Sequence, residues 1–314
     1  MKFIESREAI SGREVKLAYE DYGDGKPVVL IHGWPLTKEM WEYQLDALVN
    51  AGLRVITYDR RGFGESDRPW TGYDYDSLAD DLHTIIQQLN LQDVTLVGFS
   101  MGGGEVARYF TRYNGENVSQ VILVSSIVPF MLKTEDNPEG IEKENMDDMM
   151  NELKNDRINF LDNFGKHFFG INILSHPIST ALLEYYRMLG SIASPRATQE
   201  CMISFGQTDL REDAKAITVP TLIIHGDADK TVPIDISSRK AAAIIPNNEF
   251  VIYENAPHGL FYSHRERLNM DLISFITNGE AATSGAEPTS IATDRSAGEF
   301  VVLSGNEEGL VTRS

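Results

Sequence analysis

Short runs of apolar and β-branched residues alternate with helix-like patterns along most of this 314-residue chain. Such alternation is typical of βαβ units, in which consecutive strands lie parallel in one sheet. Several runs are apolar throughout, as expected when helices cover both faces of the sheet. We expect strands at Val28–Ile31, Arg54–Tyr58, Val94–Val97, Val118–Val124, Thr221–Ile224 and Glu249–Tyr253. The sequence therefore predicts an α/β fold with a mostly parallel central sheet flanked by helices.

Two opening segments, Lys2–Ala9 and Glu14–Tyr22, alternate polar and apolar residues around Ser11-Gly12. This pattern predicts an antiparallel hairpin at one edge of the sheet. Helices between or after the expected strands are predicted at Ser77–Leu89, Met101–Tyr113, Ile234–Ile245 and Phe261–Ile276.

Between Phe130 and Ile217 the strand rhythm stops, and the segment turns helical, acidic at first and then rich in Phe and Tyr. We interpret residues 131–216 as a helical cap inserted between two core strands of a domain of residues 1–278, with its aromatic residues packed between helices. From residue 279 onward small and polar residues dominate without a sustained period. We expect the acidic tail at 279–314 to be disordered, with Phe300–Leu303 as a β-prone exception.

The chain is strongly acidic, with 28 Lys and Arg against 47 Asp and Glu and a net charge of −19. Nucleic acid and anionic membranes are therefore not expected as partners, because binding to phosphates relies on basic side chains. The single cysteine, Cys201, cannot close an intrachain disulfide. Neither a signal-peptide core near the N-terminus nor an apolar run long enough to span a bilayer is visible, so we expect a cytoplasmic protein.

The segment GFSMG at residues 98–102 directly follows one expected strand and precedes an expected helix. A GxSxG motif in that context places its serine on a sharp strand-to-helix turn, where the glycines leave room for a strained backbone. Ser100 is therefore the candidate nucleophile. Gly103 and Gly104 continue the run, and we expect them to let this helix approach the sheet closely.

A serine hydroxyl needs a base to take its proton, and histidine is the usual base because its pKa lies near neutrality. His258 stands in a loop after the last expected strand, whereas His32 and His225 end strands and are expected to be structural. The base needs a carboxylate partner. We favour Asp229 over Asp227, because Asp229 lies further from its strand end and can reach the loop of the base.

A negatively charged oxygen formed during acyl transfer requires two N–H donors, one after the nucleophile and one in the loop after the third strand. Met101 and Trp34 occupy those positions, and Pro35 fixes the conformation after Trp34. The segment DRRGFGES at 59–66 lacks a phosphate-loop ending and is interpreted as a brace for the Trp34 loop. HExxH, a Cys/His cluster and a strand-linked GxGxxG are absent from the sequence, so neither a metal nor a dinucleotide cofactor is expected.

Taken in order, the segments HGWP, DRRGFGES, GFSMGGG, HGDAD and APHG resemble the α/β-hydrolase superfamily. The longer segment GFSMGGGEVARY at 98–109 is similar more narrowly to the bacterial cofactor-free haloperoxidases, also called perhydrolases, and their aryl-esterase relatives. The resemblance covers about residues 1–278 and implies an α/β-hydrolase fold. It also implies that Ser100, Asp229 and His258 are catalytic and that Trp34 and Met101 donate to the oxyanion. The residues that it implies for the substrate pocket are Pro35, Val128, Phe205, Thr231 and Val232.

The resemblance further implies a serine esterase for small carboxylic esters or acids that forms an acyl-enzyme without a cofactor. Water would complete hydrolysis, whereas hydrogen peroxide would yield a peracid that oxidises halide. We hypothesise that Pro35 orients the Trp34 carbonyl to accept a hydrogen bond from peroxide. A lactonase or amidase with the same triad and a ligand-binding receptor with vestigial turnover are alternatives that the sequence leaves open. The natural acyl group is not fixed by the sequence, and a homo-oligomer is compatible with it.

Overall fold

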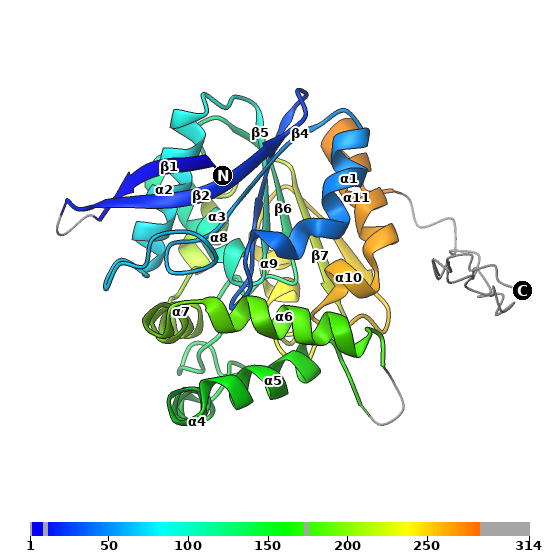
Figure 1. The fold of residues 1–314 in the computed structure, drawn as a ribbon. Helices are drawn as coiled ribbons and strands as arrows, with labels where there is room; N and C mark the ends of the chain where they lie inside the picture. The colour runs from blue at the N-terminus through cyan, green and yellow to red at the C-terminus, as the bar shows by residue number, and fades with distance from the viewer. Residues whose placement is uncertain (1, 9–11, 173–175, 283–314) are drawn as a thin grey trace, which may run out of the picture. The chain divides into compact units, whose positions relative to one another are not determined.

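The computed structural model describes residues 2–8, 12–172 and 176–282 of the chain. Within these residues eight strands form one sheet in the order β1-β2-β4-β3-β5-β6-β7-β8 (Figure 1). The strands are β1 (Lys2–Arg7), β2 (Glu14–Tyr22), β3 (Pro27–Ile31), β4 (Arg54–Tyr58), β5 (Val94–Phe99), β6 (Val118–Val124), β7 (Thr221–Gly226) and β8 (Asn248–Tyr253). β2 pairs antiparallel with both β1 and β4, and the other neighbours pair in parallel. The predicted mostly parallel sheet is confirmed.

Helices cover both faces of this sheet, and alternate residues of a strand face different layers. Val29 and Ile31 of β3 belong to a hydrophobic cluster with residues of α2 and α3. Val28 and Leu30 of the same strand belong to a second cluster with residues of α1 and α11. The helices outside the β6–β7 connection are the 3₁₀ helix η1 (Lys38–Trp41), α1 (Glu42–Asn50), α2 (Tyr75–Gln88), α3 (Met101–Tyr113), α9 (Ser238–Ile244), α10 (Leu260–Ser263) and α11 (Arg265–Asn278).

Three helical predictions differ from the structure. Helix α1 was not expected at all, because its polar residues dilute the apolar period. The helix expected over Phe261–Ile276 is interrupted at His264, whose φ of −125° and ψ of 31° are not helical. The helix expected from Ile234 begins only at Ser238, because Ser237 has a φ of −122° and a ψ of −99°. The predicted tip of the hairpin at Ser11 and residues 283–314 of the tail predicted from residue 279 lie outside the described residues. The start of that tail differs from the expected disorder, because Ala281 is buried and its N–H donates to Glu249 Oε2 at 2.9 Å.

The long connection between β6 and β7 contains helices α4 (Lys143–Asn155), α5 (Arg157–Phe168), α6 (Thr180–Ile192), α7 (Pro195–Gln207) and α8 (Arg211–Ala216). Several of these helices start at polar N-cap residues; for example, Ser179 and Ser194 each accept a hydrogen bond from a backbone N–H of the first turn. Helices α4 to α7 lie side by side across one end of the sheet (Figure 1). In the described part of the chain, helices are too short or too polar to cross a membrane.

Candidate active site

Ser100 lies at the sharp turn between β5 and α3. Its φ of 53° and ψ of −118° are unfavourable for a residue with a side chain, and such a conformation costs about 1–3 kcal/mol. The neighbouring glycines make this turn feasible. A Cβ on Gly98 would lie 2.7 Å from Gly103 Cα, and a Cβ on Gly102 would lie 2.7 Å from the Ile31 carbonyl oxygen of β3. The helix thus approaches the sheet closely, as its glycine run predicts, although Gly104 faces the Tyr75 ring of α2 instead.

His258 bridges the serine and a buried carboxylate. Its Nδ1 lies 2.6 Å from Asp229 Oδ2, and its Nε2 lies 3.0 Å from Ser100 Oγ. Because the carboxylate accepts a hydrogen bond from Nδ1–H, the imidazole presents an unprotonated Nε2 to the serine hydroxyl. The rings of Phe99 and Phe168 pack against the imidazole with centroids 5.0 and 4.7 Å away, which fixes its plane.

Asp229 is buried, yet it is surrounded by donors. Its Oδ1 accepts backbone N–H bonds from Thr231 (2.9 Å) and Val232 (2.8 Å). Burial raises the pKa of Asp229, but the charge of His258 and the hydrogen bonds from His225 and His258 outweigh burial and hold the pKa well below its usual value. The carboxylate is therefore ionised at neutral pH and can stabilise an imidazolium at His258.

His225 is a second histidine beside the same carboxylate. Ser238 Oγ donates to its Nδ1 at 2.7 Å. Its Nε2–H then faces the Val232 carbonyl at 2.9 Å and Asp229 Oδ2 at 3.1 Å. The sequence predicts a satisfied structural imidazole at His225 but not its contact with Asp229; the spacing of four residues between the two was the available signal. His225 is thus in place to orient the carboxylate.

Asp227 has a different position from Asp229. It is exposed, and its Oδ1 accepts a hydrogen bond from the Asn255 backbone N–H at 2.6 Å. The loop after β7 is tied in this way to the loop that carries His258. Asp227 therefore acts on the two loops and not on the imidazole.

The loop after β3 lies directly beside the serine. A Cβ on Gly33 would lie 3.1 Å from Ser100 Cβ, so the neighbouring Trp34 is close to the reacting centre. The Trp34 indole donates to the Thr198 carbonyl at 3.0 Å, which links this loop to α7. Met101 is the first residue of α3, and its N–H has no carbonyl partner within the helix. The start of α3 and the loop that carries Trp34 thus both lie next to Ser100.

A network of buried hydrogen bonds holds the loop that carries Trp34. Arg60 Nη2 donates to the His32 carbonyl at 2.6 Å, and the Arg60 backbone N–H donates to His32 Nε2 at 2.9 Å. Burial and the charge of Arg60 lower the pKa of His32 well below its usual value, so this imidazole is neutral. The segment at 59–66 lies where the sequence analysis expected a brace for this loop.

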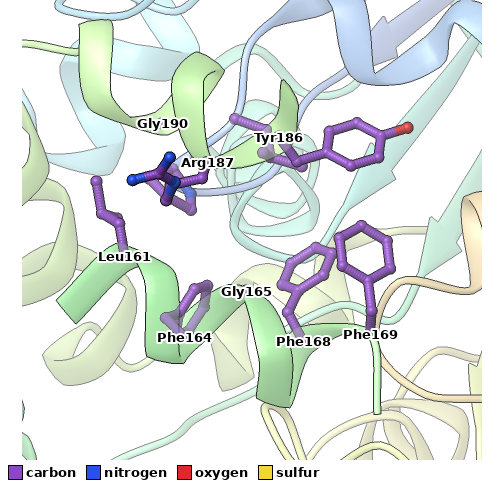
Figure 2. Close-up of a pocket in the computed structure, with 10 residues that line it drawn as sticks. Leu161, Phe164, Gly165, Phe168, Phe169, Tyr186, Arg187 and Gly190 are labelled. Atoms are coloured by element: carbon purple, nitrogen blue, oxygen red, sulfur yellow. The ribbon is translucent and has the colours of Figure 1, made fainter. Parts of the chain in front are cut away.

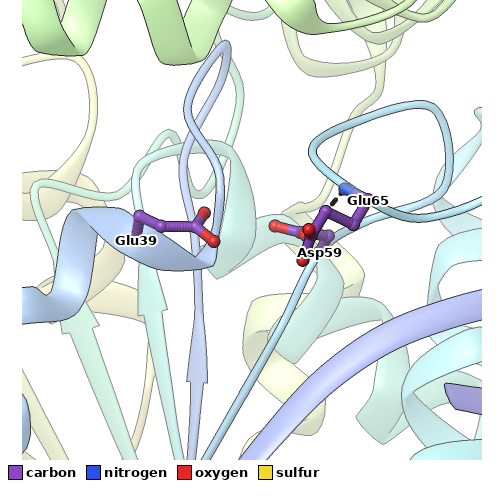
Figure 3. Close-up of side chains that lie close together, drawn as sticks. All are labelled: Glu39, Asp59 and Glu65. Carbon is purple, nitrogen blue, oxygen red and sulfur yellow. Dashed lines mark hydrogen bonds between the residues drawn. The ribbon is translucent and has the colours of Figure 1, made fainter. Parts of the chain in front are cut away.

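Three carboxylates, those of Glu39, Asp59 and Glu65, converge next to the same loop, with oxygens within 4.8 Å of one another (Figure 3). Lys38 Nζ lies 2.5 Å from Glu39, 3.1 Å from Asp59 and 3.1 Å from Glu65. Burial lowers the pKa of Lys38, but the neighbouring carboxylates raise it more, and the net pKa is above its usual value. One ammonium group, that of Lys38, therefore already contacts all three carboxylates.

A cavity opens above Ser100 beneath the helices of the β6–β7 connection. It encloses about 610 Å³, including the solvent at its mouth, which is within the size range of small-molecule sites. Besides Ser100 its lining residues are Trp34, Ile127, Met131, Ile141, Met146, Met149, Phe164, Met202, Phe205, Gly206, Thr231 and Val232. None of these lining residues carries a charge, so this cavity suits a neutral, apolar group.

A second, smaller hollow of about 310 Å³, again including open solvent, lies between α5 and α6 (Figure 2). Phe164 lines both spaces. The Phe164 ring also packs against Trp34 with centroids 5.1 Å apart. Phe164 therefore both packs α5 against the Trp34 loop and lines the cavity. The two spaces are therefore neighbours that share one aromatic side chain.

The structure places the five residues expected in the substrate pocket in three locations. Phe205, Thr231 and Val232 line the cavity with Ser100. Pro35 lines the second hollow instead, where its Cγ would lie 3.2 Å from a Cβ on Gly190 of α6. Val128 is not among the lining residues; its side chain is fully buried in the hydrophobic core. The four methionines of the cavity were not predicted, because no local sequence pattern joins them.

Comparison with known proteins agrees with this geometry. The family described as alpha/beta hydrolase fold matches residues 26–265. The protein is therefore an α/β hydrolase, and the fold expected from the sequence motifs is confirmed.

Three similar proteins indicate the family within the α/β hydrolases to which this chain belongs. A non-haem chloroperoxidase of Kitasatospora aureofaciens is 41% identical over 83% of this chain and 96% of the relative. A bifunctional esterase/perhydrolase of Acinetobacter calcoaceticus is 37% identical over the same shares of the two chains. The crystal structure of a bromoperoxidase from Bacillus anthracis is 44% identical, with a TM-score of 0.83, and covers 88% of this chain and 99% of its own. The chain belongs to the non-haem haloperoxidase family of α/β hydrolases.

Proposed function

We propose that this protein is a serine esterase for small, uncharged acyl groups that also carries out perhydrolysis. The observation that carries the proposal is the continuous series of contacts from Asp229 Oδ2 through His258 to Ser100 Oγ, at 2.6 and 3.0 Å, beside an apolar cavity. The similarity to a chloroperoxidase and to an esterase/perhydrolase supports the same reading.

In the first half of the reaction, Ser100 Oγ attacks the carbonyl carbon of the ester while His258 Nε2 takes the hydroxyl proton. Asp229 stabilises the imidazolium that forms. The N–H groups of Trp34 and Met101 donate to the negatively charged oxygen of the tetrahedral intermediate. His258 then returns the proton to the leaving alcohol, and the acyl group stays on Ser100.

In the second half, His258 takes a proton from the nucleophile that attacks the acyl-enzyme. It returns this proton to Ser100 Oγ as the bond between the acyl carbon and Oγ breaks. Water gives a carboxylic acid, and hydrogen peroxide gives a peracid, which oxidises halide after its release. Both nucleophiles are small and neutral, so the same imidazole serves both. In this scheme the chain's own residues perform each proton transfer.

A panel of acyl esters assayed with and without hydrogen peroxide tests the proposal. The wild type should hydrolyse aryl esters and form peracid when peroxide is present. Ser100→Ala should lose both activities by about 10⁶-fold, because the nucleophile is gone. Retention of ester hydrolysis by Ser100→Ala, or turnover of lactones or amides alone by the wild type, would contradict it.

Pro35 provides a test of how water and peroxide are distinguished. We propose that Pro35 orients the Trp34 carbonyl to accept a hydrogen bond from peroxide. Pro35→Leu should then lower the ratio of perhydrolysis to hydrolysis, measured with the same ester in the presence and absence of peroxide. An unchanged ratio would contradict this role, whatever happens to the absolute rates.

We also propose a division of the chain into functional parts. Residues 1–278 form the catalytic domain, within which residues 131–216 act as a cap over the cavity. Met146, Phe164 and Met202 come from this segment and line the space above Ser100. Of the tail predicted at 279–314, residues 283–314 are proposed to be dispensable for catalysis, which a chain that ends at Ala282 would test by its esterase rate.

A further inference from the structure

The cavity above Ser100 is unusually rich in methionine. Four of the ten methionines of the chain line it: Met131, Met146, Met149 and Met202. They come from three separate segments, the loop after β6, helix α4 and helix α7. A single amphipathic helix therefore does not explain their convergence beside the serine.

The sulfur atoms differ from the other apolar groups of this cavity in one chemical respect. A thioether is readily oxidised to a sulfoxide, whereas the side chains of Ile127, Val232 and Phe205 are not. At position 206 a glycine lies against one of the thioethers, and a Cβ there would be only 3.0 Å from Met146 Sδ. On that side Met146 Sδ packs against a residue that has no side chain.

We propose that the peracid formed at Ser100 oxidises the methionines of this cavity, and that this oxidation limits the enzyme's own turnover. The inference rests on the perhydrolase activity proposed above. It adds a modification site, with the peracid as oxidant and the four thioethers as acceptors.

The oxidation step balances without another reactant. The sulfur lone pair attacks the terminal oxygen of the peroxy group, a new S–O bond forms, and the O–O bond breaks. The peroxy proton passes to the departing carboxylate. One peracid and one thioether thus give one carboxylic acid and one sulfoxide, with sulfur oxidised and the peroxide oxygen reduced.

A sulfoxide changes the cavity because it places a polar group among apolar neighbours. Met131 and Met202 are only 3% and 5% exposed, so their sulfoxides would have few polar partners. Binding of an apolar acyl group should weaken, and the rate should decline with the amount of peracid already made.

Methionines outside the cavity serve as controls that show whether the oxidant comes from the active site or from bulk solvent. Met188 and Met270 are 50% and 54% exposed, whereas Met40 is fully buried. An oxidant that arrives from bulk solvent should reach Met188 and Met270 first. An oxidant produced beside Ser100 should react with the methionines of the cavity before it escapes.

The test uses the full chain, ethyl butyrate and hydrogen peroxide, with peptide mapping by mass spectrometry after a series of times. Peracid is measured in the same samples. The comparison arm is Ser100→Ala exposed to added perbutyric acid at the concentration that the wild type produces. We expect the ratio of cavity sulfoxides to sulfoxides at Met188 and Met270 to be several-fold higher in the wild type that makes its own peracid.

Equal ratios in the two arms, with peracid present, would overturn this inference and leave the perhydrolase proposal intact. Failure of the wild type to form peracid would overturn the perhydrolase proposal and, with it, this inference. A second readout uses a variant with leucine at all four cavity positions. Its esterase rate, relative to its own starting rate, should decline several-fold more slowly during perhydrolysis than that of the wild type, and an equal decline would contradict self-limitation.

Discussion

The two sides of the site are built from different parts of the fold and held by different forces. Ser100, Asp229 and His258 stand in loops after strands β5, β7 and β8, where short hydrogen bonds fix them. Opposite them, Met146 and Phe164 belong to helices of the β6–β7 connection and are held by apolar contacts. Hydrogen bonds specify direction, whereas apolar contacts specify mainly volume. We therefore expect the polar side to set the reaction rate and the apolar side to set the choice of acyl group.

Among the substitutions that test the two sides, the largest effect is expected at the buried carboxylate of Asp229. Asp229→Asn should lower kcat for aryl-ester hydrolysis by about 10⁴-fold, because the amide cannot stabilise the imidazolium and favours the wrong tautomer of His258. Steady-state kinetics measures the change, with the melting temperature recorded to show that the fold persists. Asp227→Asn is the matched control, since Asp227 contacts the Asn255 backbone and not the imidazole. Equal losses in the two variants would show that the loops, and not the carboxylate, control the rate.

A smaller effect is expected from the second histidine. His225→Gln removes the Nε2–H that faces Asp229 Oδ2 at 3.1 Å, so kcat should fall about tenfold, the equivalent of one hydrogen bond to a charged group. Because this contact also helps to lower the pKa of Asp229, its removal should raise the pKa of that carboxyl, and the pH profile of kcat is recorded alongside.

His83→Gln provides the control for that experiment. His83 stacks on Tyr113 with ring centroids 3.8 Å apart, and it does not contact the site residues named above. Its kcat and pH profile should match those of the wild type. If His225→Gln also kept both, His225 would have no positioning role.

The role of the apolar side in the choice of acyl group can be tested at Gly206, which lines the cavity. Gly206→Val fills the cavity near Met146 Sδ, so kcat/KM for hexanoate should fall about tenfold relative to acetate. Gly190→Val is the matched change in the second hollow, where a Cβ would lie 3.2 Å from Pro35 Cγ (Figure 2). It should leave the preference between the two esters unchanged. A shift in preference caused by Gly190→Val alone would place the acyl chain in the second hollow.

The smallest effect is expected at Cys201, which lies with Met202 on helix α7 and should not react in the folded protein. Burial raises the pKa of the Cys201 thiol to about 12, and the side chain is fully buried. Since the thiolate is the reactive form, iodoacetamide should not alkylate the folded protein at pH 8, whereas the unfolded chain should react fully. Rapid alkylation of the folded protein, read by intact mass, would show that α7 opens readily towards solvent.

The same division explains what the sequence could and could not predict. Trp34, Ser100, Asp229 and His258 each follow a strand that is recognisable from its apolar run. The carboxyl ends of parallel strands meet at one edge of the sheet, so the proximity of these residues follows from local patterns and topology. The two partners of His258, Ser100 and Asp229, are therefore predictable from the sequence.

The apolar side could not be predicted in this way. The convergence of Met131, Met146 and Met202 depends on how three segments pack, and no period along the chain records that arrangement. The same reason explains why Val128 was expected in the pocket but is buried in the core. The contact between His225 and Asp229 was missed for a different reason, because a histidine at a strand end is usually satisfied by its own loop.

The central claim is that Ser100 is the nucleophile of acyl transfer, and labelling with a fluorophosphonate tests it most directly. After reaction, intact mass gives the stoichiometry, a peptide map gives the position, and aryl-ester hydrolysis is followed in the same samples. We predict one label per chain on Ser100, activity that falls in proportion to labelling, and an unlabelled Ser100→Ala variant. A label on another residue, or full esterase activity after complete labelling of Ser100, would contradict the account.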